Sequence, residues 1–364
     1  MKNFHVDKDI KKAETLPASF YRDDEVFEFL KSSVFAKSYQ WFGSVDDLLP
    51  QESYVKPLTF IEGFIEEPFF LRKDSSLGLT CFSNVCTHRG NLIFHHEGAS
   101  KTISCGYHGR TWKTDGAFKF MPEFKEVENF PRPCDHLQKF KTALLGPQVF
   151  VGINPNIDLE KIFSKMNERI GFLPLEEFKH DKKNSKDYIV NCHWALYCDN
   201  YLEGFHIPFV HDDLNAVLDY GSYTTELFEN GSLQIGYSSG GEEVFDLPAG
   251  HPDEGKDVAA YYYWVFPNMM FNFYPWGLSV NVVRPISKNK TRVLFRSYVW
   301  DESKLSAGAG AVLDKVERED EFVVEGVHKG LQSESYQTGR FSPTREQGVH
   351  HFHRLLAESL KGAL

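Results

Sequence analysis

Two short segments of the chain each place a cysteine just before a histidine. The first is "CTHRG", with Cys86 and His88, and the second is "CGYHG", with Cys105 and His108. Two thiolates and two imidazoles can hold a tetrahedral zinc ion, or a 2Fe-2S cluster in which histidines replace the cysteines on one iron. Chance placement in a core is the less favoured interpretation, since cysteine and histidine at ligand spacing are uncommon.

Glycines beside these pairs favour the cluster over zinc. Gly90, Gly106 and Gly109 flank the candidate ligands. Glycine lets the backbone come close to a bulky inorganic core and point its N–H groups at sulfide. A cluster needs this more than a single ion does.

The order and spacing of the two pairs resemble the Rieske motif, in which C-x-H and C-x2-H are separated by about sixteen residues. The resemblance implies that Cys86 and Cys105 hold one iron and that His88 and His108 hold the other. Imidazole ligands in place of thiolates raise the potential of such a cluster. A cluster with this ligand set would therefore be suited to accept electrons from a ferredoxin or a reductase.

A second constellation lies in "DNYLEGFHIPFVH". His206 and His211 are five residues apart, which on an ideal helix separates them by about 140°. Pro208 disturbs the backbone between them, so the two rings can still converge on one atom. Glu203 precedes His206 by one turn. From these residues alone, a structural role and a ligand role for the histidines are equally favoured.

A late segment supplies a candidate carboxylate. "AVLDKVEREDEFVVEGVHKGL" predicts a helix whose buried stripe consists of Val312, Leu313, Val316, Val323, Val324, Val327 and Leu331. Asp320 falls within about 20° of the stripe's centre, and Glu319 about 80° from it. A buried carboxylate needs a partner, either a metal or an arginine. Two histidines and one carboxylate form the facial triad of non-haem Fe(II) oxygenases, which leaves positions open for O2 and substrate.

Together the two constellations resemble the Rieske non-haem iron oxygenases over nearly the whole chain. The resemblance implies that His206, His211 and Asp320 bind a mononuclear Fe(II). It also implies an α+β fold, in which an all-β Rieske domain is inserted into a helix-grip catalytic domain of antiparallel sheet and helices.

The same resemblance assigns two further side chains. Glu203 matches the carboxylate that links the iron site of one subunit to the Rieske histidine, here His108, of the next, in a ring-shaped homotrimer. Asn200 matches an amide near the iron, although an ordinary polar residue at a helix start is an equally good interpretation. Arg110 stands where tryptophan is common in the family, which puts the docking of the electron-donor protein in question. His328 stands where many relatives have glutamine, which puts the surroundings of the iron in question.

These side chains must be positioned by three expected parts of the chain: an N-terminal helical segment at 1–37, the Rieske domain at 38–150 and the catalytic domain at 151–364. Patterning predicts helices at 23–38, 158–173, 311–331 and 345–361, a strand at 187–197, and a helix from 199 that Pro208 ends. No internal repeat is found.

Composition narrows the function further. A net charge of −11 argues against nucleic acid as a partner. No apolar run reaches the roughly 20 residues needed to span a bilayer, and the first residues do not form a signal peptide, so we predict a cytoplasmic protein. Of the six cysteines, two are expected to be ligands and four to be free thiols.

Within the family the chain most resembles the branch of choline monooxygenase and enzymes acting on N-methylated compounds, through "NYLEGFHIPFVH" and "FPNMMFNFYPWG". We therefore expect an O2-dependent monooxygenase of a quaternary ammonium compound, with aromatic rings that contact the cation. NAD(P)H must act through a separate reductase or ferredoxin, because no dinucleotide-binding or plant-type ferredoxin motif is found. The alternatives are an aromatic-ring dioxygenase, a non-catalytic Rieske electron carrier and, third, a zinc-binding structural protein.

Overall fold

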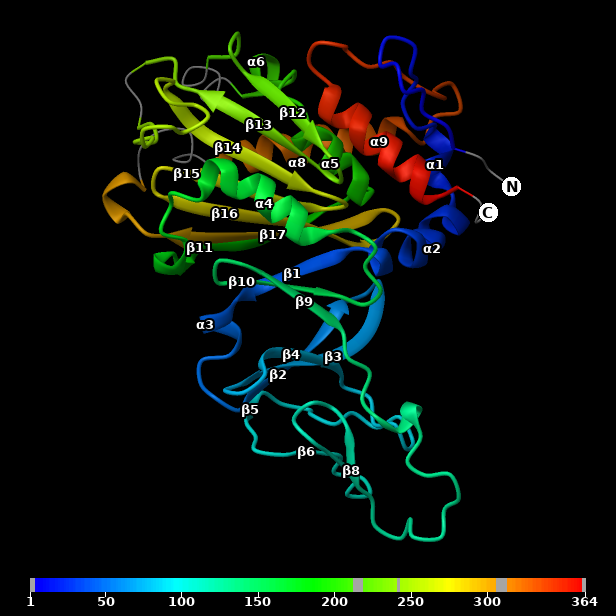
Figure 1. The fold of residues 1–364 in the computed structure, drawn as a ribbon. Coiled ribbons are helices and arrows are strands. Elements are labelled where there is room, and N and C mark those ends of the chain that lie inside the picture. The colour runs from blue at the N-terminus through cyan, green and yellow to red at the C-terminus, as the bar shows by residue number, and fades with distance from the viewer. Residues whose placement is uncertain (1–3, 212–218, 241–242, 306–312, 362–364) are drawn as a thin grey trace. The chain divides into compact units, whose positions relative to one another are not determined.

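The chain divides into two compact units, described separately. One is the continuous segment Ala36–Asn156, and the other combines Met1–Phe35 with Ile157–Leu364, so the first unit is an insertion in the second along the sequence (Figure 1). The computed structural model describes residues 4–211, 219–240, 243–305 and 313–361.

The discontinuous unit is built on a seven-stranded antiparallel sheet in the order β11-β17-β16-β15-β14-β13-β12. Its inner strands are rich in aromatic and β-branched residues and are buried along nearly their whole length, whereas the edge strand β11 is largely polar and exposed. The strands are β11 (Lys179–Val190), β12 (Thr224–Phe228), β13 (Gly231–Tyr237), β14 (Val258–Val265), β15 (Met269–Tyr274), β16 (Gly277–Ser287) and β17 (Lys290–Val299).

Helices accompany this sheet, and α5 is central among them because it packs against α8, α9 and β16. The helices of this unit are α1 (Ala18–Arg22), α2 (Asp24–Ser33), α4 (Leu159–Ile170), α5 (Trp194–Tyr201), α6 (Ile207–Val210), α8 (Leu313–Gly330) and α9 (Gln347–Ser359). Short 3-10 turns cover Phe35–Lys37, Leu175–Glu177 and Glu302–Lys304. The helices predicted at 158–173, 311–331 and 345–361 are thus confirmed where the structure describes them.

The strand predicted over 187–197 is wrong in its second half. Strand β11 ends at Val190 and α5 begins at Trp194, where the ring of His193 accepts a hydrogen bond from the backbone of Ala195. The first five residues of α5 are all buried. A segment buried on every side has no helical periodicity, so its aromatic and apolar residues resemble a strand.

Pro208 does not end a helix as predicted. Helix α5 already ends at Tyr201, and Pro208 lies in the first turn of the short helix α6, where a missing N–H costs nothing. A turn of residues 202–206 separates the two helices. The rest of the predicted segment, residues 212–214, lies outside the described residues.

Helix α8 carries the predicted buried stripe only in part. Val324 and Leu331 are buried, but Val327 is 46 % exposed, and Glu317, a charged residue, is only 3 % exposed. Val312 and Leu313 lie outside the described side chains. The stripe was derived from apolar residues alone, so it missed the buried carboxylic acid.

The start of the chain is tied to its end. The backbone N–H of Leu16 donates to Nδ1 of His353 on α9 (3.0 Å), and that of Ala18 donates to the carbonyl of Gln337 (2.8 Å). Residues separated by more than 300 positions therefore complete one unit.

The continuous unit consists of three small antiparallel sheets, in the orders β1-β10-β9, β4-β3-β2-β5 and β6-β7-β8. Their strands are β1 (Tyr39–Ser44), β2 (Tyr54–Ile61), β3 (Ile65–Asp74), β4 (Gly78–Ser83), β5 (Gly98–Ala99), β6 (Ile103–Ser104), β7 (Thr111–Trp112), β8 (Phe118–Phe120), β9 (Lys141–Leu145) and β10 (Gln148–Gly152). The only helical turns in its described residues are α3 (Val45–Leu48), a 3-10 turn at Pro133–Asp135 and most of the 3-10 turn at Phe35–Lys37. The unit is thus mainly β-structure.

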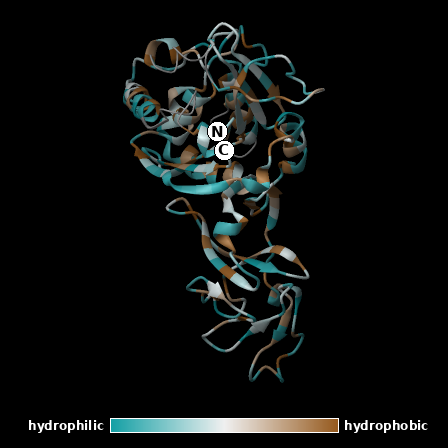
Figure 2. Ribbon diagram, turned by 90° about the vertical axis from the view of Figure 1, so that its left-hand side faces the viewer, coloured by the Kyte–Doolittle hydropathy of each residue, from teal (hydrophilic) through white to brown (hydrophobic). Residues whose placement is uncertain are grey.

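Two expectations from the sequence concern the whole chain: one is about membrane-spanning segments and the other about the cysteines. Among the described residues, no helix is long and apolar enough to cross a membrane, and the helices in Figure 2 carry both hydrophilic and hydrophobic colour. None of the six cysteines forms a disulfide.

Candidate metal centres

The two Cys-His segments of the continuous unit form matching loops. The N–H of Gly90 donates to the carbonyl of Cys86 (2.9 Å), and the N–H of Gly109 donates to that of Cys105 (3.0 Å). Both glycines have positive φ angles, +72° and +73°, which other residues rarely adopt. Each glycine thus closes a turn that starts at a cysteine.

The four predicted ligand side chains come together at these loops. The His88 and His108 rings have centroids 4.8 Å apart, and the thiols of Cys86 and Cys105 lie close enough to shift each other's pKa. Nδ1 of His88 is buried without a hydrogen-bond partner among the described residues. A buried nitrogen of this kind is what a metal would satisfy, so the four residues fit a cluster.

Hydrogen-bond donors around one cysteine favour the thiolate that a metal requires. Burial alone would raise the pKa of Cys105, but backbone N–H groups and the amide of Asn91, 3.6 Å from the sulfur, outweigh burial and lower the pKa. Such donors stabilise a negatively charged sulfur.

Arg110, which departs from the family pattern, is not a surface residue. It is 1 % exposed, its guanidinium donates to the carboxylate of Asp135 (2.7 Å), and it also reaches the carbonyl of Thr87 (3.3 Å). Thr87 lies between two predicted ligands, and Arg110 follows the second motif. The Arg110–Asp135 pair therefore fastens the two loops together, and docking is not its direct role.

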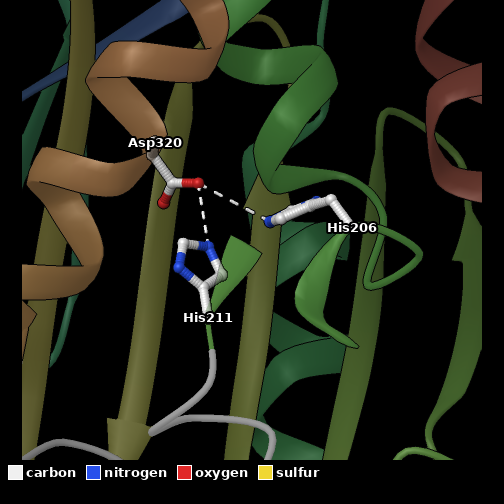
Figure 3. Close-up of side chains that lie close together, drawn as sticks. All are labelled: His206, His211 and Asp320. Carbon is white, nitrogen blue, oxygen red and sulfur yellow. Dashed lines mark hydrogen bonds and ion pairs between the residues drawn. The ribbon is translucent and has the colours of Figure 1, made fainter. Parts of the chain in front are cut away.

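The second predicted constellation comes together in the discontinuous unit (Figure 3). Oδ1 of Asp320, on α8, lies 3.0 Å from Nε2 of His211 and 3.6 Å from Nε2 of His206. Within the described residues, these three are the one group of metal-type side chains whose ligand atoms all lie within 4.8 Å of one another. The donor set, two imidazoles and one carboxylate, suits a non-haem iron.

Each histidine of this group is held at its other nitrogen by a carboxylate. Glu203 Oε1 lies 2.7 Å from Nδ1 of His206, and Glu319 Oε2 lies 2.7 Å from Nδ1 of His211. Because carboxylates only accept, both Nδ1 atoms donate and both Nε2 atoms are turned towards the centre. The pKa of His211 is raised, since Asp320 and Glu319 outweigh the opposing effect of burial.

Helices α5 and α8 are joined by two parallel side-chain bonds. Nδ2 of Asn200 donates to Oδ1 of Asp320 (2.6 Å), and one turn earlier the hydroxyl of Tyr197 donates to Glu317. Asn200 lies in the last turn of α5. The alternative interpretation, an ordinary polar residue at a helix start, is therefore wrong. The amide of Asn200 helps to fix the orientation of the Asp320 carboxylate.

A cavity of about 120 Å³ lies beside the three residues. At roughly 10–15 Å³ per water, it has room for about ten water-sized groups, which suits a small organic molecule. It is lined by Tyr197, Asn200, Tyr201, Glu203, His206, Ile207, His211, Tyr223, Gln234, Tyr262, Asn272, Tyr274, Asn281, Phe295, Val316, Glu317 and Asp320. A second cavity, of about 240 Å³, shares Asn200, Glu203 and His206 with the first.

Sequence reasoning missed two carboxylic acids of this site and misjudged one histidine. Glu319 was rejected because it lies off the apolar stripe, yet that angle turns it towards His211. Glu317 had no apolar neighbour pattern to mark it. His328 accepts a weak hydrogen bond from the backbone of His193 (3.4 Å) and lines neither cavity, so the concern about the surroundings of the iron is not supported.

Family models match both units. Residues 175–362, more than half of the chain, match the model described as ring hydroxylating alpha subunit (catalytic domain), and residues 47–131 match the Rieske [2Fe-2S] domain. The catalytic match disfavours both a simple electron carrier and a zinc-binding structural protein.

Curated relatives extend over nearly the whole chain. The chain is 28 % identical to chloroplastic choline monooxygenase of Arabidopsis thaliana over 97 % of its own length and 84 % of that protein. It is 28 % identical to the carnitine monooxygenase oxygenase subunit of Escherichia coli strain K12, over 96 % and 95 % of the two chains.

Solved structures share the fold. The quaternary ammonium Rieske monooxygenase CntA with L-carnitine has a TM-score of 0.72 at 24 % identity, covering 95 % of this chain and 96 % of that one. Naphthalene 1,2-dioxygenase from Rhodococcus sp. has a TM-score of 0.69 at 15 % identity, covering 95 % and 93 %. The α+β fold of an all-β Rieske domain with a sheet-and-helix catalytic domain is thereby confirmed.

Proposed function

The chain belongs to the ring-hydroxylating alpha subunits with a Rieske domain, and from this membership we propose that it is the terminal monooxygenase of a small quaternary ammonium compound. Family membership means that it is an oxygenase with a 2Fe-2S cluster and a mononuclear iron, and that it uses O2 and a separate electron donor. The relatives named for choline and carnitine support the substrate class.

The observation that carries the proposal is the group of His206, His211 and Asp320 at the wall of a cavity. We propose that these three residues hold the mononuclear iron, and that Cys86, His88, Cys105 and His108 hold the cluster. When bound, the cluster supplies electrons and the iron activates O2, so that one oxygen atom enters a substrate C–H bond and the other leaves as water.

The protein's own residues orient this chemistry. Glu203 and Glu319 keep the protons on Nδ1 of the two histidines, so that each Nε2 is free to bind metal. Asn200 holds one oxygen of Asp320 and thereby limits how the carboxylate can turn. Tyrosine rings line the cavity and would displace water from the part of the substrate that they contact. Hydroxylation of an N-methyl group would lead to its loss as formaldehyde.

The proposal includes an assembly and an electron path. Glu203 lines both cavities and contacts His206. This position suits a link to a Rieske histidine, His108, of a neighbouring subunit in a homotrimer. The electrons would come from NAD(P)H through a separate reductase or a ferredoxin. The cytoplasmic location stays a prediction.

The experiment is anaerobic purification with added iron, followed by metal analysis and turnover with choline, carnitine and an aromatic acid. About three irons per chain are expected, falling to about two in Asp320→Ala with the cluster spectrum intact, whereas Glu325→Ala on the same helix keeps all three. Full iron and turnover in Asp320→Ala would falsify the ligand assignment. Hydroxylation of the aromatic acid alone would overturn the substrate class.

A further inference from the structure

We infer that the cavity selects a permanent cation that carries no carboxylate, and that Glu317 is the side chain that holds this cation. The inference rests on the proposed function, because it concerns the substrate of the same iron site. It distinguishes between two kinds of quaternary ammonium compound, those with a single positive charge and the zwitterions.

The charge of the cavity wall is one-sided. Three carboxylic acids line it, Glu203, Glu317 and Asp320, and the described lining includes no lysine or arginine. The internal segments outside the described residues, 212–218, 241–242 and 306–312, contain no lysine or arginine in the sequence. The one cation proposed at this wall is the iron, whose charge Asp320 partly offsets, so a ligand carboxylate elsewhere in the cavity would be desolvated without a cationic partner, which is costly.

Two of the three acids already have a task. Asp320 faces both histidines, and Glu203 holds Nδ1 of His206. Glu317 has neither contact. Its Oε2 accepts from the hydroxyl of Tyr197, and its Oε1 is buried without a hydrogen-bond partner among the described residues.

Burial makes the unpartnered oxygen of Glu317 costly. The pKa of Glu317 is raised well above its ordinary value, chiefly by burial and further by Asp320 and Glu321, against the hydrogen bond from Tyr197. The charge of Arg318 acts with the Tyr197 hydrogen bond but does not outweigh burial, so the buried carboxyl would still gain from more positive charge. A substrate cation would provide it, and a quaternary ammonium does so without donating or losing a proton.

The position of Glu317 suits the reaction. It precedes Asp320 by three residues on α8, which is about 4.5 Å of helix rise on nearly the same face. The parallel bonds from Tyr197 and Asn200 keep the two acids side by side. A cation held by Glu317 would therefore present its neighbouring C–H groups beside the histidines and Asp320.

Aromatic rings complete the surroundings of the cation. Tyr201, Tyr223, Tyr262 and Tyr274 line the cavity, and the Tyr262 and Tyr274 rings meet edge to face with centroids 5.9 Å apart. Burial raises the pKa of Tyr274 well above its ordinary value, so its ring stays neutral. Each ring face would contribute about 0.5–2 kcal/mol to cation binding.

The test measures binding by anaerobic equilibrium dialysis with protein that holds both metal centres. Choline is compared with 3,3-dimethylbutan-1-ol, in which carbon replaces nitrogen, and L-carnitine with its methyl ester, which removes only the carboxylate charge. We expect choline to bind at least about tenfold more tightly than the neutral compound, and the ester at least about tenfold more tightly than the acid. These comparisons need no variant.

Variants then test the role of Glu317. Glu317→Gln keeps the size of the side chain, and we expect it to remove most of the preference for choline over the neutral compound. Glu321→Gln, on the same helix but outside the cavity lining, should keep that preference. An unchanged preference in Glu317→Gln overturns the role of this residue.

The outcomes separate this inference from the proposed function. If L-carnitine binds as tightly as its ester and is hydroxylated, the charge selection is wrong although the protein is still a quaternary ammonium oxygenase. If no cation binds or is hydroxylated and an aromatic acid is, the proposed function fails. Similar binding of choline and the neutral compound contradicts the inference in either case.

Discussion

Nδ1 of His211 is held by Oε2 of Glu319 at 2.7 Å, the same distance at which Glu203 holds His206. The two contacts have different origins, since Glu203 is three residues from its histidine and Glu319 is 108 residues away. The first contact follows from local sequence, whereas the second exists only after α8 has packed against the site.

We predict that Glu319→Ala weakens Fe(II) binding about 10- to 100-fold, because His211 loses the partner that fixes its ring. Competition with a chelator under anaerobic conditions measures the affinity, and the cluster spectrum should not change. Glu325→Ala serves as the control, since Glu325 contacts Asn191 instead of the site. Unaltered iron affinity in Glu319→Ala would show that packing alone fixes the His211 ring.

Glu203→Gln is expected to retain both metal centres and to slow the arrival of electrons at the mononuclear iron by about 10-fold or more. The neutral amide keeps the shape but cannot accept from His206 as a carboxylate does. Reoxidation of the reduced cluster after addition of O2 and substrate, followed by its visible absorbance, measures the transfer. Glu229→Gln, a surface pair of Lys161, is the control, and equal rates in both variants would contradict the role.

Arg110→Met should destabilise the Rieske unit by about 3–5 kcal/mol, because the carboxylate of Asp135 loses its buried partner and keeps only Arg132, whose side chain is 64 % exposed. The double variant Arg110→Met with Asp135→Leu should lose less. Thermal loss of the cluster absorbance measures both. Equal losses in the single and double variants would mean that the pair is not the reason for the destabilisation.

The motifs made the four Rieske residues predictable, and also the group of His206, His211 and Asp320, because the spacing within each motif is local and specific. The helical-wheel argument turned Asp320 inward, and the structure places it beside His206 and His211, but the same argument rejected Glu319. An angle relative to an apolar stripe tells which residues face the core, and does not tell where a loop such as that of His211 approaches. The first half of helix α5 was mistaken for a strand because its residues are all buried, and Glu317 was overlooked because carboxylic acids are rarely buried.

Stability at low pH should depend on Asp253. Burial would raise its pKa, but hydrogen bonds from Lys256 and from Arg169 (2.7 Å) outweigh burial and lower it. Because the pKa of Asp253 is lower in the folded protein, its carboxylate stabilises the fold at pH values above its ordinary pKa of about 4. This contribution is lost as the pH falls through the pKa of the folded protein. Asp253→Asn should cost about 3–5 kcal/mol at neutral pH, and the difference from the unchanged protein should shrink below about pH 4. Urea unfolding at several pH values checks this, and a pH-independent difference would refute it.

Gly348→Ala should destabilise the catalytic unit by about 1–3 kcal/mol. A Cβ at Gly348, in the first turn of α9, would lie 2.3 Å from the carbonyl oxygen of Leu202, so α9 would have to move away from the residue that precedes Glu203. Thermal unfolding measures the loss, with Gly330→Ala as the control because a Cβ there meets no atom within 4 Å. Equal stability of the two variants would show that α9 shifts freely.

The bonds from Leu16 and Ala18 to residues near the end of the chain have a consequence for biosynthesis. As the ribosome proceeds, residues 36–156 emerge as one continuous segment, whereas Leu16 must wait for α9 to provide its partner His353. The catalytic unit thus closes only after α9 has been synthesised, and a chain that stops before α9 would lack the partner of Leu16.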